Sequence, residues 1–324
     1  MGGLWSCTRQ GFSVLCEFAR SFPDTLADLL DRDCHLRRNF REETATDLLM
    51  MGLVGLQSLG ITVDFPDEVA TGGDMEWLFA APHDVGGGTY VRLIIQSKRS
   101  KFAPSNSGGY WFYEHLDHGD PAGAQAHTLV NYAATSPDGH ATLPLYFFYH
   151  PRSAITPIPG RPNIEGLNVV LGDRVAKVVA GGCGRAQKKV EAWRDHFFSL
   201  SDLLCWPLSP TSLASGLPGQ WTTEFLIDGA FSEGRVGQPA WHPQFVADRL
   251  NALLQDSAQE GGRRWRLEPA TGLPDEIRQA LAAEKLIKER PKVRRPRAIF
   301  TSSVSSADPS FEQNRKAMRA RRHG

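Results

Sequence analysis

Residues 71–99 constrain the fold more than any other stretch, because they contain two apolar segments that alternate with a period of two around a glycine-rich turn. This pattern predicts two neighbouring β-strands. The alternation places Asp74 and Glu76 on one face of the first strand. Gln96 and Lys98 share a face of the second strand. We therefore expect a carboxylate, an amide oxygen and an ammonium group to meet at one end of a two-stranded surface.

This combination suits metal-assisted hydrolysis of a phosphodiester bond. Mg²⁺ prefers oxygen ligands and typically takes only one or two carboxylates from a protein, so Asp74 and the Gln96 amide oxygen are candidate ligands for Mg²⁺ or Mn²⁺. Lys98 is predicted to position the attacking water or to neutralise developing negative charge. Glu76 is a candidate for a second metal contact.

A further carboxylate is predicted from the helix that begins near residue 41. Glu43, Thr46 and Asp47 are spaced i, i+3 and i+4 and share one helical face. We therefore choose Glu43 over Glu42 as the third metal ligand, with Asp47 as a secondary site residue. Each of these residues singly also has a simpler explanation, since acidic residues at helix starts and aspartates in turns are common.

Taken in order, these motifs resemble the restriction-endonuclease-like superfamily, the PD-(D/E)xK nucleases, in its Q-x-K variety. They also look like those of a bacterial family that shares this core. The matching motifs are E-T-A-T-D at 43–47, G-G-D-M-E-W at 72–77, Q-S-K-R at 96–99, Gln125, and P-L-Y-F-F-Y at 144–149. Two departures are present: no proline precedes Asp74, and Gln96 cannot give the metal a negative charge.

The resemblance implies an α/β (α+β) fold, in which a central mixed sheet is flanked by helices in the order α-β-β-α-β. It implies a metal-dependent nuclease acting on nucleic acid, DNA in the first instance, in bacterial defence. Glu43, Asp74, Gln96 and Lys98 would be the catalytic set, and Gln125 would orient Lys98 or water. The alternatives are a nuclease-fold binding or scaffolding module without catalysis, and an unrelated α/β protein.

The predicted organisation has four parts. Residues 1–39 form a helical segment packed on the core, 40–219 the restriction-endonuclease-like core, 220–291 a C-terminal α/β extension, and 292–324 a basic, disordered tail. The formal net charge is zero, but residues 284–324 contain twelve Lys or Arg and four Asp or Glu, a local excess of +8. The rest of the chain is correspondingly acidic, which argues against binding of nucleic acid over its whole surface.

Nucleic-acid contacts are therefore predicted at two places. Arg99 and Lys101 follow the Q-x-K strand, and Arg294, Arg295 and Arg297 open the basic tail. Such a tail can bind a polyanion electrostatically. The alternative is a solubilising end with no partner.

Residues 102–123 form a loop rich in glycine and aromatic residues, beside the predicted site. Its aromatic run, residues 110–113, has two readings. The rings can stack on nucleic-acid bases, or they can anchor the loop to the core.

The remaining features concern location. Five scattered cysteines without C-x-x-C spacing argue against a disulfide framework and favour a reducing compartment. No apolar run is long enough for a membrane span, and no secretory signal is evident. We therefore expect a cytoplasmic protein without a membrane partner. The oligomeric state stays open, a homodimer included.

Overall fold

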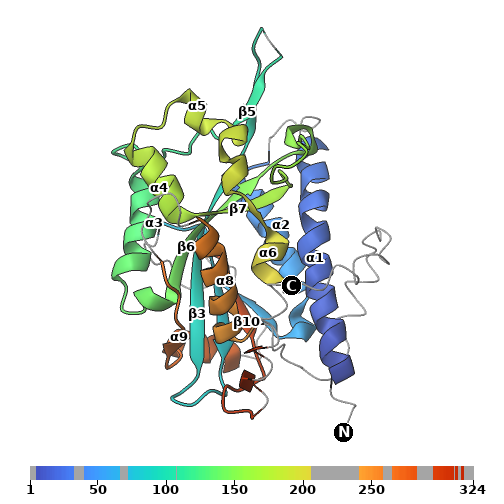
Figure 1. The fold of residues 1–324 in the computed structure, drawn as a ribbon, viewed down its shortest axis with the longest axis vertical. Helices are drawn as coiled ribbons and strands as arrows, with labels where there is room; N and C mark the ends of the chain where they lie inside the picture. Colours follow the sequence, from blue (N-terminus) through green and yellow to red (C-terminus); the bar gives the residue numbers. More distant parts are fainter. Residues whose placement is uncertain are drawn as a thin grey trace.

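The computed structural model describes residues 5–32, 40–65, 72–106, 108–205, 241–257, 265–282, 295–309, 311–312 and 315–316. It is a mixed α/β structure in which an eight-stranded sheet is flanked by helices (Figure 1). This confirms the predicted fold class. None of the helices in the described ranges combines the length and apolarity that a membrane crossing requires.

The central sheet has the strand order β1-β10-β2-β3-β6-β7-β8, and β9 also pairs with β3. β10 with β2 and β3 with β6 are parallel pairs, and the other pairs are antiparallel. The strands are β1 (Ile61–Asp64), β2 (Met75–Ala81), β3 (Thr89–Arg99), β6 (Thr142–Tyr149), β7 (Leu167–Leu171), β8 (Phe198–Ser199), β9 (Ala270–Thr271) and β10 (Arg297–Thr301). A separate two-stranded sheet contains β4 (Lys101–Ala103) and β5 (Tyr110–Phe112).

Helices cover both faces of the sheet (Figure 1). They are α1 (Trp5–Arg32), α2 (Glu42–Val54), α3 (Ala124–Thr135), α4 (Gly172–Ala180), α5 (Arg185–Lys188), α6 (Leu200–Leu204), α8 (Pro243–Ser257) and α9 (Asp275–Ala282). Short 3₁₀ turns lie at Gln57–Leu59, Gly139–Ala141, Arg152–Ala154 and Val190–His196. α1, α2, α6 and α8 pack on one face, and α3, α4 and α9 on the other.

β3 is buried along almost its whole length, as its continuous apolar run predicts. Val91, Leu93 and Ile95 face the larger core beneath α1, α2 and α8. Ile94 faces the second core beneath α3 and α4. Apolar layers cover both sides of the middle of the strand, and its polar residues lie nearer its ends. Gln96 and Lys98 occupy one such end.

The prediction of a disordered basic tail is wrong for residues 297–301. They form β10, which pairs with β1 on one side and β2 on the other. Ala298, Ile299 and Phe300 are fully buried. The short apolar run A-I-F supplies this strand, but the basic residues before it dominate the average composition on which the prediction is based.

The predicted division into a core and a C-terminal extension also needs correction. α8 packs its apolar face, including Val246 and Leu250, into the same large core as β2 and β3. Ile277 of α9 packs against Ile299 of β10 in a third cluster. The described part of 220–291 thus completes the central domain. The N-terminal helix packs on this core as predicted, through residues such as Leu15 and Phe18.

Candidate active site

The candidate site begins where the chain enters β2 alongside β3. The Asp74 backbone N–H donates to the Ile95 carbonyl at 2.7 Å, which fixes Asp74 beside the polar end of β3. Gly73 allows this approach, because a Cβ there would lie 2.7 Å from Ile94 Cγ2 and 3.1 Å from the Ile95 carbonyl oxygen. The Gly72-Gly73 pair is therefore required by close backbone contact.

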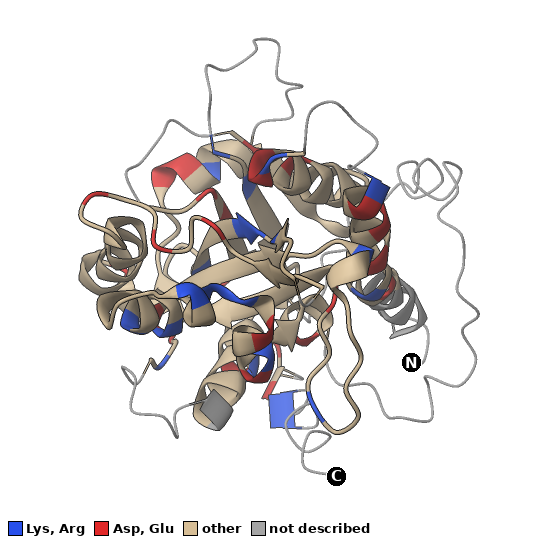
Figure 2. Cartoon of the chain, turned by 90° about the horizontal axis from the view of Figure 1, so that it is seen from above, with Lys and Arg blue, Asp and Glu red and all other residues tan. Residues whose placement is uncertain are grey.

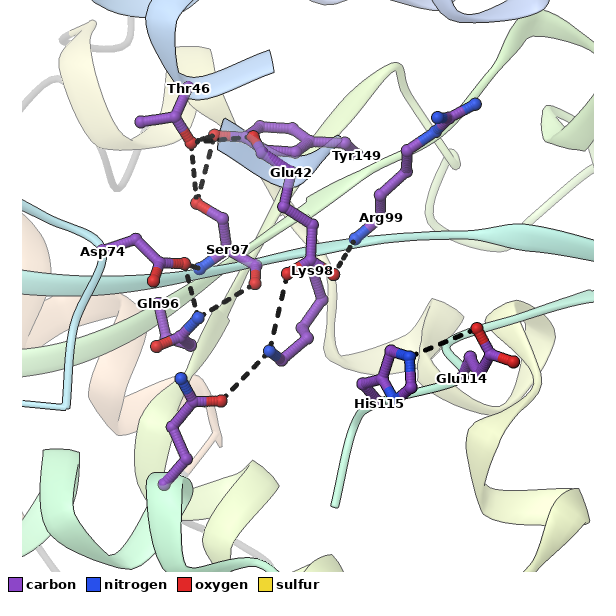
Figure 3. A network of polar contacts seen from close by, with 11 residues as sticks. Glu42, Thr46, Asp74, Gln96, Ser97, Lys98, Arg99, Glu114, His115 and Tyr149 are labelled. Atoms are coloured by element: carbon purple, nitrogen blue, oxygen red, sulfur yellow. Dashed lines mark hydrogen bonds and ion pairs between the residues drawn. The ribbon is translucent and has the colours of Figure 1, made fainter. Parts of the chain in front are cut away.

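The Asp74 carboxylate is held by its neighbours on β3 (Figure 3). Its Oδ2 accepts a hydrogen bond from the Ser97 backbone N–H at 2.8 Å and another from Gln96 Nε2. Burial raises the pKa of Asp74 to about 6, although the Ser97 N–H and the charge of Lys98 act to lower it. The Asp74 carboxyl therefore loses its proton at a higher pH than an ordinary aspartate does.

Gln96 is almost completely buried, with 1% of its surface exposed. Its Nε2 donates to Asp74 and to the Ser97 carbonyl oxygen, the latter at 3.2 Å. Its Oε1 is buried and has no hydrogen-bond partner among the described residues. A buried acceptor without a partner is unfavourable by about 1–3 kcal/mol, which marks this oxygen as a ligand-binding atom or as a tolerated cost of the fold.

Lys98 is also nearly buried, and its ammonium group lies between two helix starts. Nζ donates to Oε1 of Gln125 at 3.1 Å and lies 3.7 Å from Oε2 of Glu42. Gln125 is in the first turn of α3, and Glu42 is the first residue of α2. The two helices pack on opposite faces of the sheet, so their N-terminal ends enclose the end of β3.

Glu42 replaces Glu43 in the set that the structure brings together. Glu42 accepts the Arg99 backbone N–H through Oε1 at 3.2 Å, in addition to its contact with Lys98. Glu43 is exposed and lies near Asp47 on the solvent side of α2. Desolvation raises the pKa of Asp47, and the charge of Glu43 raises it further. Neither Glu43 nor Asp47 joins the cluster around Lys98.

The sequence does contain a signal for Glu42 that the face-sharing argument missed. Glu42 lies on the same helical stripe as Ala45, Leu49 and Leu53, all buried, whereas Glu43 shares its stripe with the exposed Met51. An acidic residue that continues a buried stripe must reach the edge of the core. Glu42 accordingly lies at the end of β3, beside Lys98 and Arg99.

Three buried hydroxyl groups fix α2 against the sheet at this point. Thr46 Oγ1 lies 3.2 Å from Ser97 Oγ and 3.1 Å from the Tyr149 hydroxyl, and the last two are 3.2 Å apart (Figure 3). Thr46 also donates to the Glu42 carbonyl. The three residues come from α2, β3 and β6. The triangle therefore sets the position of Glu42 relative to Lys98, and no sequence spacing could have revealed it.

Glu76 lies on the predicted face of β2 but has a different role. Its two carboxylate oxygens pair with Arg92 Nε at 3.0 Å and Arg297 Nε at 2.8 Å. Arg92 also pairs with Asp138 at 3.5 Å, and Arg297 with Glu276 at 3.3 Å. Both oxygens of Glu76 are thus engaged by arginines, which corrects its prediction as a second metal contact.

The predicted nucleic-acid-binding cations are mostly engaged within the protein. Arg99 donates to the Phe40 carbonyl, Lys101 pairs with Glu114, and Arg297 is buried in its ion pairs. Arg295 lies close enough to Asp74 to lower the pKa of that carboxyl. Arg294 lies outside the described residues. Seen from above, basic and acidic positions are interspersed (Figure 2).

The donor set can be compared with the needs of a divalent cation. No three His, Cys, Asp or Glu side chains gather as metal ligands anywhere in the described ranges. At the end of β3 the oxygen donors are two carboxylates, Asp74 and Glu42, and the buried Oε1 of Gln96. One or two carboxylates with a neutral oxygen is a donor set that suits Mg²⁺ or Mn²⁺, so these residues fit such an ion.

Comparisons with known proteins bear on the family. Neither the curated proteins nor the solved structures contain a match to this chain. One family model does match, and it covers residues 15–307, which include every element of the candidate site. The chain therefore belongs to DUF6615, a family of unknown function.

Proposed function

We propose that this protein is a divalent-metal-dependent nuclease with a restriction-endonuclease-like active site, acting on DNA in the first instance. The observation that carries the proposal is the position of Lys98. Its ammonium group is buried beside Glu42 and Gln125, on the same end of β3 as the Asp74–Gln96 pair. A buried cation next to carboxylate and amide oxygens suits a site that stabilises negative charge on a phosphate.

Asp74, Gln96 and Glu42 are the residues that would hold Mg²⁺ or Mn²⁺. When bound, the ion supplies Lewis-acid stabilisation of the phosphate and activates water. In the structure Gln96 turns its amide nitrogen to Asp74 and leaves Oε1 without a partner. Rotation of this amide by 180° would present the oxygen on the Asp74 side, so the side chain can serve either the metal-free or the loaded site.

Lys98 has the contacts expected of a residue that acts on the transition state. Gln125 accepts one of its three N–H bonds and Glu42 lies within ion-pair distance, so the ammonium group is oriented. A further N–H can donate to a phosphate oxygen or to the attacking water. Because the group is 4% exposed, its charge is screened little by solvent.

A second candidate function is a binding or scaffolding module that has the fold without the chemistry. The observation in its favour is the hydrogen bond from Gln96 to Asp74, which satisfies the carboxylate inside the protein. A neutral glutamine also adds no negative charge for the metal. Turnover of nucleic acid is what separates the two functions.

The deciding experiment compares wild-type protein with Lys98→Met, which keeps the apolar volume of the buried stem and removes the charge. Each protein is incubated with Mg²⁺ or Mn²⁺ and labelled double-stranded DNA, single-stranded DNA or RNA. We expect cleavage by the wild type and a loss of at least 100-fold in the variant, with binding affinity retained, since the lysine acts in the transition state.

The variant also identifies contaminating activity, because a co-purified nuclease would not respond to Lys98. Equal cleavage by both proteins contradicts the proposal, and so does binding without cleavage by the wild type, which would favour the scaffolding function. Metal binding has its own readout: Mn²⁺ should raise the melting temperature of the wild type and not of Asp74→Asn.

A further inference from the structure

The hairpin formed by β4 and β5 continues directly from the strand that carries Lys98. Ser100 ends the central sheet, with its backbone N–H donating to the Tyr149 carbonyl at 3.0 Å, and β4 begins at the next residue. Figure 1 shows this hairpin extending away from the body of the molecule. Phe102 is four residues from Lys98, so their Cα atoms are at most roughly 14 Å apart.

An aromatic pair lies across the two strands of the hairpin. Phe102 is opposite Trp111 in the register, and the ring centroids are 5.4 Å apart. Trp111 packs on the core beneath α3 and α4, whereas Phe102 is 49% exposed. Trp111 thus supports Phe102 from the protein side. About half of the Phe102 side chain is thus left accessible on a protruding hairpin, where a ligand can reach it.

The turn of the hairpin holds Phe102 in place. Gly109 has φ +95°, and a Cβ at this position would collide with the Phe102 ring. The ring therefore lies against the glycine backbone on one side and Trp111 on another. A ring held in this way loses little conformational freedom when a ligand stacks on it.

Cations lie at the base of the same hairpin. Lys189 is bridged to Phe112 and places Nζ 4.8 Å from the centre of the Tyr110 ring. It is exposed, and within the described residues it has no carboxylate partner. Lys101, which starts β4, is also exposed, but it is paired with Glu114, so of the two lysines Lys189 is the one available to a ligand. Aromatic rings alongside lysines are the combination by which proteins bind single-stranded nucleic acid, since the rings stack on bases and the cations follow the phosphates.

We propose that the β4–β5 hairpin is a binding arm for single-stranded nucleic acid, in which Phe102, supported by Trp111, stacks on an unpaired base. On the proposed nuclease function, the bound strand then passes Lys98; stacking on Phe102 does not require that function. At about 3.4 Å per stacked nucleotide, the Cα–Cα distance from Phe102 to Lys98 spans at most about four nucleotides. A paired base in a duplex has no free face for such stacking, so the arm selects unpaired or locally opened strands.

The test measures binding in EDTA, where no metal-dependent cleavage takes place, with full-length protein and fluorescently labelled oligonucleotides. The probes are oligo-dT and oligo-rU of equal length, an abasic DNA strand of equal charge, and a duplex. The variants are Phe102→Ala and Phe102→Leu, the latter apolar without an aromatic face. Val85→Ala is the matched control, because Val85 is an exposed apolar residue in the turn before the opposite end of β3.

We expect the wild type to bind oligo-dT or oligo-rU more tightly than the abasic strand, and the preferred sugar distinguishes DNA from RNA. Phe102→Ala and Phe102→Leu should each weaken that binding roughly tenfold and abolish the preference over the abasic strand. The salt dependence should not change, because no phosphate contact is lost. Val85→Ala should bind like the wild type.

Equal affinity of the wild type for the base-containing and abasic strands overturns the proposal, and so does unchanged binding by both Phe102 variants. Absence of all oligonucleotide binding overturns it too and leaves a protein partner for the arm. None of these outcomes depends on cleavage. Loss of turnover in Lys98→Met with normal binding in the Phe102 variants would contradict the arm alone.

Discussion

At the scale of single residues, the candidate site depends on where each polar group meets the core. Gln96 and Lys98 could be predicted from the sequence because strand alternation assigns them to one face of β3. Asp74, by contrast, directly precedes β2 and is placed by its backbone hydrogen bond to Ile95. The spacing to Thr46 could not decide between Glu42 and Glu43, because they precede Thr46 by four and three residues and both spacings place a side chain on its helical face. The buried stripe of α2 decides between them.

The pair Glu42 and Glu43 offers a matched test on one helix. Glu42→Gln removes the carboxylate beside Lys98 and should lower nuclease activity at least 100-fold. Glu43→Gln makes the same chemical change on the exposed side and should change activity less than twofold. The measurement is kcat/KM on one DNA substrate. The reverse order of effects would restore Glu43 to the site.

Asp74 gives a prediction about stability and pH. Its folded-state pKa is raised from 3.8 to about 6, so the folded protein holds this proton more tightly than the unfolded chain. The resulting stability is complete below pH 3.8 and is lost as the pH rises through 6. Asp74→Asn should therefore be more stable than the wild type at pH 7, by on the order of 1–3 kcal/mol.

The measurement is urea denaturation in EDTA at several pH values from 4 to 7. The difference between the two proteins should grow across this window, because the variant lacks the titrating group. A difference that stays constant with pH would show that the Asp74 pKa is not raised in the folded state.

At the scale of elements, the sequence predicts where strands occur better than it predicts which strands pair with one another. β2, β3 and β6 follow from local alternation and long apolar runs, so their existence needs no knowledge of the rest of the chain. β10 has only three apolar residues, with basic residues before it and a serine-rich stretch after it. Its place is determined by non-local pairing with β1 and β2 and by the ion pairs of Arg297 with Glu76 and Glu276.

Removing residues 295–324 should therefore prevent folding, because it leaves β1 and β2 without the strand between them. Removing residues 317–324, which lie outside the described ranges, is the matched control and should leave the fold intact. Circular dichroism and thermal melting distinguish the two. A cooperative transition in the longer truncation, at the temperature of the full-length protein, would contradict the central role of β10.

At the scale of the whole molecule, several of the cations that the structure describes are paired with carboxylates of the same chain. Arg297 lies inside the sheet, and Lys101 and Lys188 are paired with Glu114 and Asp117. Cations close to the candidate site are thus mostly neutralised by neighbours. Composition alone could not show this, since it records charges and not their partners.

The affinity for nucleic acid should accordingly depend weakly on salt. If Lys98, Lys189 and Arg295 are the main phosphate contacts, the slope of log affinity against log salt for a single strand is about −2. Titration of labelled single-stranded DNA at several salt concentrations measures this slope. A slope steeper than about −5 would mean that a larger basic surface, including residues outside the described ranges, dominates binding.

The position of β10 also has a consequence for how the protein is made. Ribosomes release the chain from the N-terminus, so β1 and β2 are synthesised more than 200 residues before β10, the strand that pairs with both. Ile61 of β1, for example, pairs with Phe300 of β10. Until β10 is synthesised, the edges of β1 and β2 that will face it have no pairing strand. Asp74 enters β2 at its start, so the geometry around it is completed only by a nearly finished chain. A product of premature termination would have the motifs of the candidate site without the complete sheet that aligns them.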